Sequence, residues 1–250
     1  MKKIGLVGGL GWLSTVEYYR AICEKSERRH QRSGLEGPSP MPEIAIESLD
    51  LCAALASLGT LGVESSWEKF DDYHRRALLR LQAAGAEIAA IASNTPHYRY
   101  ASICDGVDIP VVDINAAIAA FCLDARIDSV AILGTEVTMR SLRLADALAR
   151  CEVTSVSPEG SEAASLAAVI ADLQHGNGAS SASAVERLGN GLLAGTGARS
   201  PAICLACTEL PLAFPEFSGA SLFEWNGARY INTAAVHAEA LFAAAEGSSP

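Results

Sequence analysis

Two short apolar stretches end in the same way, and they constrain the fold of this chain more than any other feature. Residues 88–92 run into Ser-Asn-Thr-Pro, which begins at Ser93, and residues 203–206 run into Cys-Thr-Glu-Leu-Pro, which begins at Cys207. Short, continuously apolar runs are typical of buried strands, and proline suits the first turn of a helix. Each stretch is therefore predicted to be a buried strand that leads into a helix.

The same arrangement of strand, small residue and helix recurs along the chain. Residues 4–7 lead into a glycine pair ending at Gly9, and residues 129–133 lead into Gly-Thr ending at Thr135. Further strands are predicted at residues 44–46, 109–112, near 153 and near 230–231. Helices are predicted at 66–84, 114–123, 163–173 and 234–245, with one from about 138 and one that begins at a capping box of Ser14 and Glu17. This alternation is typical of an α/β protein with parallel sheets.

The pattern occurs twice, which predicts two related lobes. Each half begins with a strand ending in glycine and later has a strand ending in Ser or Cys shortly before Thr. The predicted fold is α/β, with two pseudo-symmetric parallel-sheet lobes and the site in the cleft between them. The predicted domains are 1–115 plus 214–250 for the N-terminal lobe and 116–213 for the C-terminal lobe.

The amino-acid composition and the net charge limit the kinds of molecule that this chain is expected to bind. The 250 residues are 50% hydrophobic and carry a formal net charge of -10, which is globular and argues against nucleic acid or an anionic membrane as the main partner. The segment after Met1 is too short for a signal or a membrane span. Seven cysteines, an odd number, then indicate free thiols and a cytoplasmic location.

The predicted strand ends bring polar groups to one edge of each sheet. Ligands of open α/β sheets bind at the carboxyl ends of strands, where Gly9, Ser93, Thr135 and Cys207 fall. Free backbone N–H groups and the threonine hydroxyls suit the carboxylate of a small acid, and a helix start stabilises a thiolate. Such a site requires neither a metal nor an organic cofactor.

Other interpretations of these residues remain open. The glycine loop after the first strand nearly matches a dinucleotide fingerprint, but Ser14 replaces the last glycine. Cys204 and Cys207 form a Cys-x-x-Cys pair without a second pair, so zinc is disfavoured, and Cys204 is expected in the core. His97 and His237 are candidates for either helix capping or catalysis. The remaining cysteines are expected to be small buried residues: Cys23, Cys52, Cys104, Cys122 and Cys151.

Taken together, these motifs resemble the aspartate/glutamate racemase family of cofactor-independent enzymes, within the PLP-independent Asp/Glu/hydantoin racemase superfamily. The resemblance spans almost the whole chain. It implies two thiols that remove and return the Cα proton from opposite faces of an amino acid, and it suggests a homodimer. The matching residues are Ile4–Gly9, Trp12, Ser14, Thr15, Tyr18, Tyr19, Ser93–His97, Leu133–Thr135, Thr138, Met139, Cys207–Glu209, Thr233, His237 and Ala238.

The chain also departs from this family. Ser93 stands where the family usually has a cysteine, and an alcohol is a far weaker acid than a thiol. The family's aspartate racemases carry an arginine after the second strand, but residues 47–51 have none, and residues 173–176 lack the lysine found in some members. The substrate side chain is therefore left open.

Three functions are compatible with these motifs and departures. The first is an amino-acid racemase or epimerase that uses Cys207 as the principal acid/base and has Ser93 on the opposite face. The second is a lyase resembling the family's arylmalonate decarboxylase branch, with one thiol that protonates a planar intermediate. The third is a non-catalytic binder of small carboxylates. The expected substrate-binding residues are Gly9, Asn94, Thr95, Thr135, Thr208 and Glu209.

Overall fold

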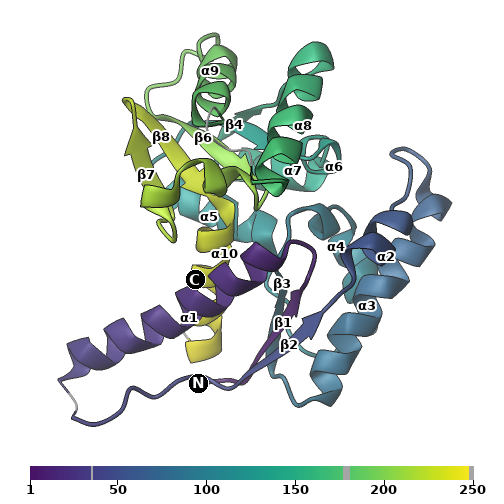
Figure 1. Cartoon of the computed structure of the whole chain (residues 1–250), viewed down its shortest axis with the longest axis vertical. Helices are drawn as coiled ribbons and strands as arrows, with labels where there is room; N and C mark the ends of the chain where they lie inside the picture. Colours follow the sequence, from purple (N-terminus) through teal and green to yellow (C-terminus); the bar gives the residue numbers. More distant parts are fainter. Residues whose placement is uncertain (35, 177–180, 248–250) are drawn as a thin grey trace. The chain divides into compact units, whose positions relative to one another are not determined.

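The chain folds into two compact units, each built from strands and helices (Figure 1). The computed structural model of the protein describes residues 1–34, 36–176 and 181–247. The first unit comprises Met1–Asp113 and His237–Pro250, and the second comprises Ile114–Val236. Both units contain parallel strand pairs connected by helices, which confirms the predicted α/β class.

The first unit is built on a parallel sheet. Within the described residues this sheet has three strands in the order β2-β1-β3, formed by β1 (Ile4–Gly8), β2 (Ile44–Ser48) and β3 (Ile88–Ile91). Helix α1 (Trp12–Ser33) connects β1 to β2, and α3 (Glu68–Ala83) connects β2 to β3. Right-handed crossovers that run in opposite directions along a sheet place their helices on opposite faces. Figure 1 shows this arrangement, with α1 on one side and α3 on the other.

Two local predictions for the first unit are wrong. Residues 109–112 do not form a strand but contribute one isolated bridge, between Val111 and Ala89. Ser14 does not cap α1, because the helix begins at Trp12 with Gly11 at the N-cap and the Ser14 side chain is buried within the helix. The remaining elements that contribute to this unit are α2 (Leu51–Ala56), η1 (Glu64–Trp67), η2 (Thr95–Arg99), α4 (Tyr100–Cys104) and α10 (Thr233–Glu246).

The second unit is built on a mixed sheet. Its described strands are β4 (Ser129–Gly134), β5 (Thr154–Val156), β6 (Pro201–Ala206), β7 (Leu222–Trp225) and β8 (Ala228–Asn232), in the order β5-β4-β6-β8-β7. All neighbours are parallel except β7 and β8, which form an antiparallel hairpin.

The β7–β8 hairpin was accessible from the sequence but was not predicted. Its turn is Asn226-Gly227, and both residues have positive φ, 50° and 78°. An Asn-Gly pair with positive φ at both positions is typical of a type I′ turn, whose twist matches that of paired strands. The pair between two apolar runs was therefore a usable hairpin signal.

Helices cover both faces of the second sheet. One apolar core contains side chains of α5 (Ile114–Asp124) and α7 (Leu142–Arg150), and the other contains side chains of α8 (Gly160–Gln174) and α9 (Ser181–Leu193). Short helices complete the described part of this unit: α6 (Glu136–Met139), η4 (Leu210–Ala213) and η5 (Pro215–Phe217). None of the helices in the described ranges is long and apolar enough to cross a membrane.

The boundary between the units differs from the predicted one. The sequence-based division assigns residues 214–236 to the first lobe, but β8 pairs with β6 in the sheet of the second unit. The reason is the buried segment Tyr230-Ile231-Asn232, which is aligned with Ile203-Cys204-Leu205 of β6. Of the residues that follow Asp113, only those from His237 onward belong to the first unit. Helix α10 therefore begins in one unit and ends in the other.

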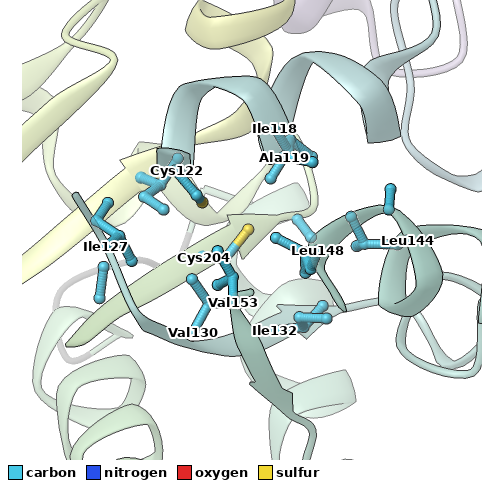
Figure 2. Close-up of a cluster of buried hydrophobic side chains, with 14 of the residues drawn as sticks. Ile118, Ala119, Cys122, Ile127, Val130, Ile132, Leu144, Leu148, Val153 and Cys204 are labelled. Atoms are coloured by element: carbon cyan, nitrogen blue, oxygen red, sulfur yellow. The ribbon is translucent and has the colours of Figure 1, made fainter. Parts of the chain in front are cut away.

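The two cysteines of the Cys-x-x-Cys pair belong to different cores. Cys204 packs with the α5 and α7 side chains, whereas Cys207 packs with the α8 and α9 side chains. Figure 2 shows Cys204 among Ile118, Cys122 and Leu148. Alternation along β6 places these thiols on opposite faces, as predicted. The prediction for other cysteines was partly wrong, because Cys52 is exposed.

Replacing Cys204 with alanine should reduce stability rather than remove a reactive group. The side chain is fully buried, so losing its sulfur leaves a small cavity and should cost about 1 kcal/mol. Urea unfolding of Cys204→Ala should show a lower midpoint, whereas the exposed Cys52→Ala should match the parent protein. Equal midpoints for the two variants would contradict this packing role.

Candidate functional site

The pairing of strands brings the predicted site residues together in two sets, one in each unit. In the first unit the β1–β3 register ends with Val7 paired to Ile91, so Gly9 and Ser93 both follow the carboxyl ends of two neighbouring strands. In the second unit Gly134 pairs with Ala206, so the next residues, Thr135 and Cys207, are level with each other. Each set lies at the carboxyl ends of two paired parallel strands, where open α/β sheets bind ligands.

Gly9 occupies a position that requires glycine. Its φ is +82°, and an added Cβ would lie 2.2 Å from the Leu49 carbonyl oxygen. Its N–H donates to Thr15 Oγ1 at 2.9 Å. The N–H of Gly9 is thus engaged within the protein, and glycine is required here because the Leu49 backbone fills the space that a side chain would need.

The segment after β3 turns sharply at the predicted Ser93. The Ser93 N–H donates to the Ile91 carbonyl at 2.8 Å, and the His97 N–H donates to the Asn94 carbonyl at 3.0 Å. Asn94 is buried, whereas Ser93 and Thr95 are half-buried. The helix predicted after this strand is the short 3₁₀ helix η2, which starts at Thr95.

Thr135 forms the N-cap of α6 in the second unit. Its hydroxyl oxygen accepts from the Thr138 N–H at 3.3 Å and lies 3.0 Å from Thr138 Oγ1. The neighbouring Gly134 is needed for close strand packing, because a Cβ there would lie 2.6 Å from the Ala206 carbonyl oxygen. The two threonine side chains thus form a linked pair beside the end of β6.

Cys207, Thr208 and Glu209 form a compact polar cluster. The Cys207 thiol donates to Glu209 Oε2 at 3.0 Å, and the Thr208 hydroxyl donates to the same oxygen at 3.1 Å. Cys207 is 6% exposed. The sequence placed Glu209 at the site but did not predict that its carboxylate would contact the thiol.

The surroundings of Cys207 favour the neutral thiol. Burial raises the pKa of Cys207 well above its ordinary value, and the Glu209 charge and hydrogen bond raise it further. The N–H groups of Thr208 and Glu209 act in the opposite direction by hydrogen bonding to the sulfur. The prediction that a helix start would stabilise the thiolate is therefore wrong, since the following element is the short 3₁₀ helix η4 and the other effects dominate.

The two candidate histidines are both fully buried in the first unit. His237 bonds to the Tyr18 hydroxyl and the Val112 carbonyl, and His97 lies 3.3 Å from Asp113 Oδ1. Neither caps a helix through these side-chain contacts. The sequence offered no signal for the Tyr18–His237 contact, which joins residues 219 positions apart.

The described side chains do not form a candidate metal site. In residues 1–34, 36–176 and 181–247, no group of three or more His, Cys, Asp or Glu side chains is arranged to hold an ion. The chemistry available at the two strand-end sets is that of a thiol, a carboxylate, hydroxyls and backbone amides. These groups can bind a small carboxylate and transfer protons.

This combination of fold and polar groups defines a class of protein, namely an α/β protein of two units with acid/base groups at the ends of parallel strands. Comparison with known proteins identifies the family. A sequence model described as Asp/Glu/Hydantoin racemase matches residues 7–241. The chain therefore belongs to the Asp/Glu/hydantoin racemase family and is, by that membership, an isomerase.

Solved structures agree with the family assignment. An aspartate racemase homologue from Pyrococcus horikoshii OT3 is 28% identical with a TM-score of 0.75, covering 98% of this chain and 100% of its own. A putative Asp/Glu racemase from Yersinia pestis is 25% identical with a TM-score of 0.78 and the same coverage. Picrophilus torridus aspartate racemase, at 18% identity, shares the fold with a TM-score of 0.72 over 98% of this chain and 94% of its own.

Neutralising Glu209 should make the Cys207 thiol more acidic. The Glu209 charge disfavours a thiolate, so Glu209→Gln should lower the thiol pKa and raise the thiolate fraction at a given pH. Iodoacetamide labelling of the Cys207 peptide, followed by mass spectrometry across pH, should show its midpoint shifted to lower pH. Glu136→Gln is the control, because Glu136 pairs with Arg140 on the surface. A midpoint unchanged by Glu209→Gln would show that the carboxylate does not act on this thiol.

Proposed function

We propose that this protein is a cofactor-independent amino-acid racemase in which Cys207 and Ser93 serve opposite faces of the substrate Cα. The observation that carries the proposal is the buried Cys207 thiol in hydrogen-bond contact with Glu209. Racemisation requires one group that removes the Cα proton and another that delivers a proton to the opposite face. Family membership supports this reaction type, and each of the two residues follows a strand end, where α/β sheets bind ligands.

The contact with Glu209 gives Cys207 a route to its basic form. The thiol proton can pass to the carboxylate oxygen 3.0 Å away, which leaves a thiolate able to take the Cα proton. Once sulfur has given the captured Cα proton to the carbanion or to solvent, the proton held by Glu209 can return to sulfur. Cys207 therefore acts as a base through its thiolate and as an acid through its thiol, with Glu209 holding the proton in between.

Binding of the α-carboxylate is assigned to the groups around these two residues. Asn94 and Thr95 follow Ser93, whereas Thr135 and Thr208 flank Cys207. Amide and hydroxyl donors suit a carboxylate and also stabilise the negative charge that develops when the Cα proton leaves. Gly9, which follows β1, is the remaining proposed substrate contact.

Ser93 makes the two half-reactions unequal. A hydroxyl can protonate a strongly basic Cα carbanion, but the resulting alkoxide is far less stable than a thiolate. Exchange of the Cα proton on the Cys207 face should therefore be faster than inversion. A homodimer in the cytoplasm and an amino acid or related small carboxylate as substrate complete the proposal.

Cys207→Ala should abolish hydrogen exchange at Cα while leaving carboxylate binding largely intact. The variant removes the only thiol proposed to act on substrate but keeps the neighbouring hydroxyl and amide donors. Single-enantiomer amino acids incubated in D2O should gain deuterium with the parent protein and none with Cys207→Ala, as read by mass spectrometry. Calorimetric titration checks that binding remains. Deuterium uptake equal to that of the parent would exclude Cys207 as the acid/base.

Ser93→Cys should accelerate inversion more than exchange. The change replaces oxygen by sulfur at nearly constant volume and supplies a second group able to form a stable anion. Chiral chromatography should show faster appearance of the opposite enantiomer, and the excess of exchange over inversion should shrink. Loss of CO2 from a malonate without inversion of any amino acid would instead identify a one-thiol lyase. Binding without either reaction would identify a carboxylate binder.

A further inference from the structure

A buried chain of side chains in the first unit leads from α1 to the segment that carries Ser93. It starts at Tyr18, whose hydroxyl lies 2.7 Å from His237 Nδ1. The other ring nitrogen of His237, Nε2, lies 3.0 Å from the Val112 carbonyl oxygen. Tyr18 and His237 are both fully buried, so these two contacts replace the water that each polar group would otherwise bind.

The contacts of His237 fix one tautomer. The Val112 carbonyl can only accept, so Nε2 carries the hydrogen. Burial, assisted by the nearby His97, lowers the pKa of His237 to about 3, so the ring is neutral near pH 7 and Nδ1 has a lone pair. Burial also raises the pKa of Tyr18, which keeps its hydroxyl protonated as the donor to Nδ1. The orientation of the ring is thereby set from both sides.

The ring of His237 is in turn packed against His97. Their centroids are 5.2 Å apart at an interplanar angle of 84°, an edge-to-face arrangement. His97 Nε2 lies 3.4 Å from the Ile91 carbonyl oxygen, and the same oxygen accepts from the Ser93 N–H at 2.8 Å. The carbonyl that sets the turn at Ser93 is therefore in contact with the ring that His237 supports.

The position of this network in the chain gives it a second effect. The chain leaves the first unit after Asp113 and re-enters it at His237. His237 bonds to Val112, and His97 lies 3.3 Å from Asp113 Oδ1. The residues at which the chain leaves and re-enters the first unit are thus tied to each other and to the turn at Ser93.

We propose that His237, held in one tautomer by Tyr18, is a positioning residue that sets the geometry of the Ser93–Thr95 turn through His97. His237 acts on the reaction without contacting substrate. The proposal deepens the proposed function and rests on it, because Ser93 must serve one face of Cα. Asn94 and Thr95 of the same turn are proposed to bind the α-carboxylate, so displacing the turn should also weaken substrate binding. At saturating substrate it should then impair the step that uses Ser93 and spare the exchange that uses Cys207.

The test compares Tyr18→Phe with Tyr19→Phe. Tyr18→Phe removes only the hydroxyl that donates to His237, whereas Tyr19 is a neighbouring tyrosine on α1 that is 49% exposed. In D2O at saturating substrate, Tyr18→Phe should lower inversion about tenfold or more while changing deuterium exchange less than twofold, since small displacements strongly affect proton transfer. Tyr19→Phe should change neither rate. A general loss of folded protein would lower both rates equally, and that result would overturn the positioning role.

Nuclear magnetic resonance supplies a readout that does not depend on turnover. The ring ¹⁵N shifts of His237 should show the Nε2–H tautomer in the parent protein, and the backbone amide signals of Ser93, Asn94 and Thr95 should move in Tyr18→Phe but not in Tyr19→Phe. If these amide signals stay in place, the inference is wrong even when the protein is an active racemase. If they move but the parent protein exchanges no Cα proton with any amino acid, the positioning role stands and the proposed function fails.

Discussion

Parallel pairing of adjacent strands is the constraint on which the candidate site depends. Two parallel strands in register end at the same edge of a sheet, so residues distant in sequence become neighbours without any contact between their side chains. The β1–β3 pairing brings Gly9 and Ser93 to one edge of the first sheet, and the β4–β6 pairing brings Thr135 and Cys207 to one edge of the second. Tight packing at Gly134, where a Cβ would overlap the Ala206 carbonyl, keeps the second pair of strands at this spacing. The chemistry of each set follows from which residue types stand at these strand ends.

Both units use the same local arrangement, with different side chains. The strand orders β2-β1-β3 and β5-β4-β6 are equivalent, and in each the first and third strands in sequence carry the site residues. In the first unit the two strands are followed by a glycine and a serine, whereas in the second they are followed by a threonine and by a thiol that contacts Glu209. The topology is repeated, but the acid/base capacity of the two sets differs.

The sequence predicted features that depend on local patterns. Apolar runs of four to six residues located the central strands, because burial on both faces requires uninterrupted apolar side chains. The short pattern at 109–112 failed, because Val111 makes only one bridge. The Ser14 cap failed because the glycine loop allows the helix to start at Trp12. Assignment of 214–236 failed because the partner of β8 is set by long-range pairing, which no local pattern encodes.

The candidate site shows the same limit. The sequence shows which residue types follow the predicted strands, and it therefore predicted Ser93, Thr135 and Cys207 as site residues. The protonation state of the Cys207 thiol could not be predicted from the sequence, because it depends on burial and on the direction of the Glu209 side chain. The packing of His237 against His97 could not be predicted from the sequence either, because the two residues lie far apart along the chain.

The path of the chain through α10 has a consequence for synthesis on the ribosome. The second unit is one continuous segment, whereas the first needs residues from both ends: Ala245 accepts from the Lys2 N–H, and Glu239 pairs with Lys25. Chains emerge from the N-terminus onward, and domains generally fold as units. The sheet of the first unit is thus synthesised before the second unit but remains without its α10 contacts until the α10 residues from His237 onward emerge. The second unit, which is synthesised in between, completes its own fold first. During that time the surface of the first unit that later contacts α10 is uncovered, and the nascent chain must stay soluble with this surface exposed.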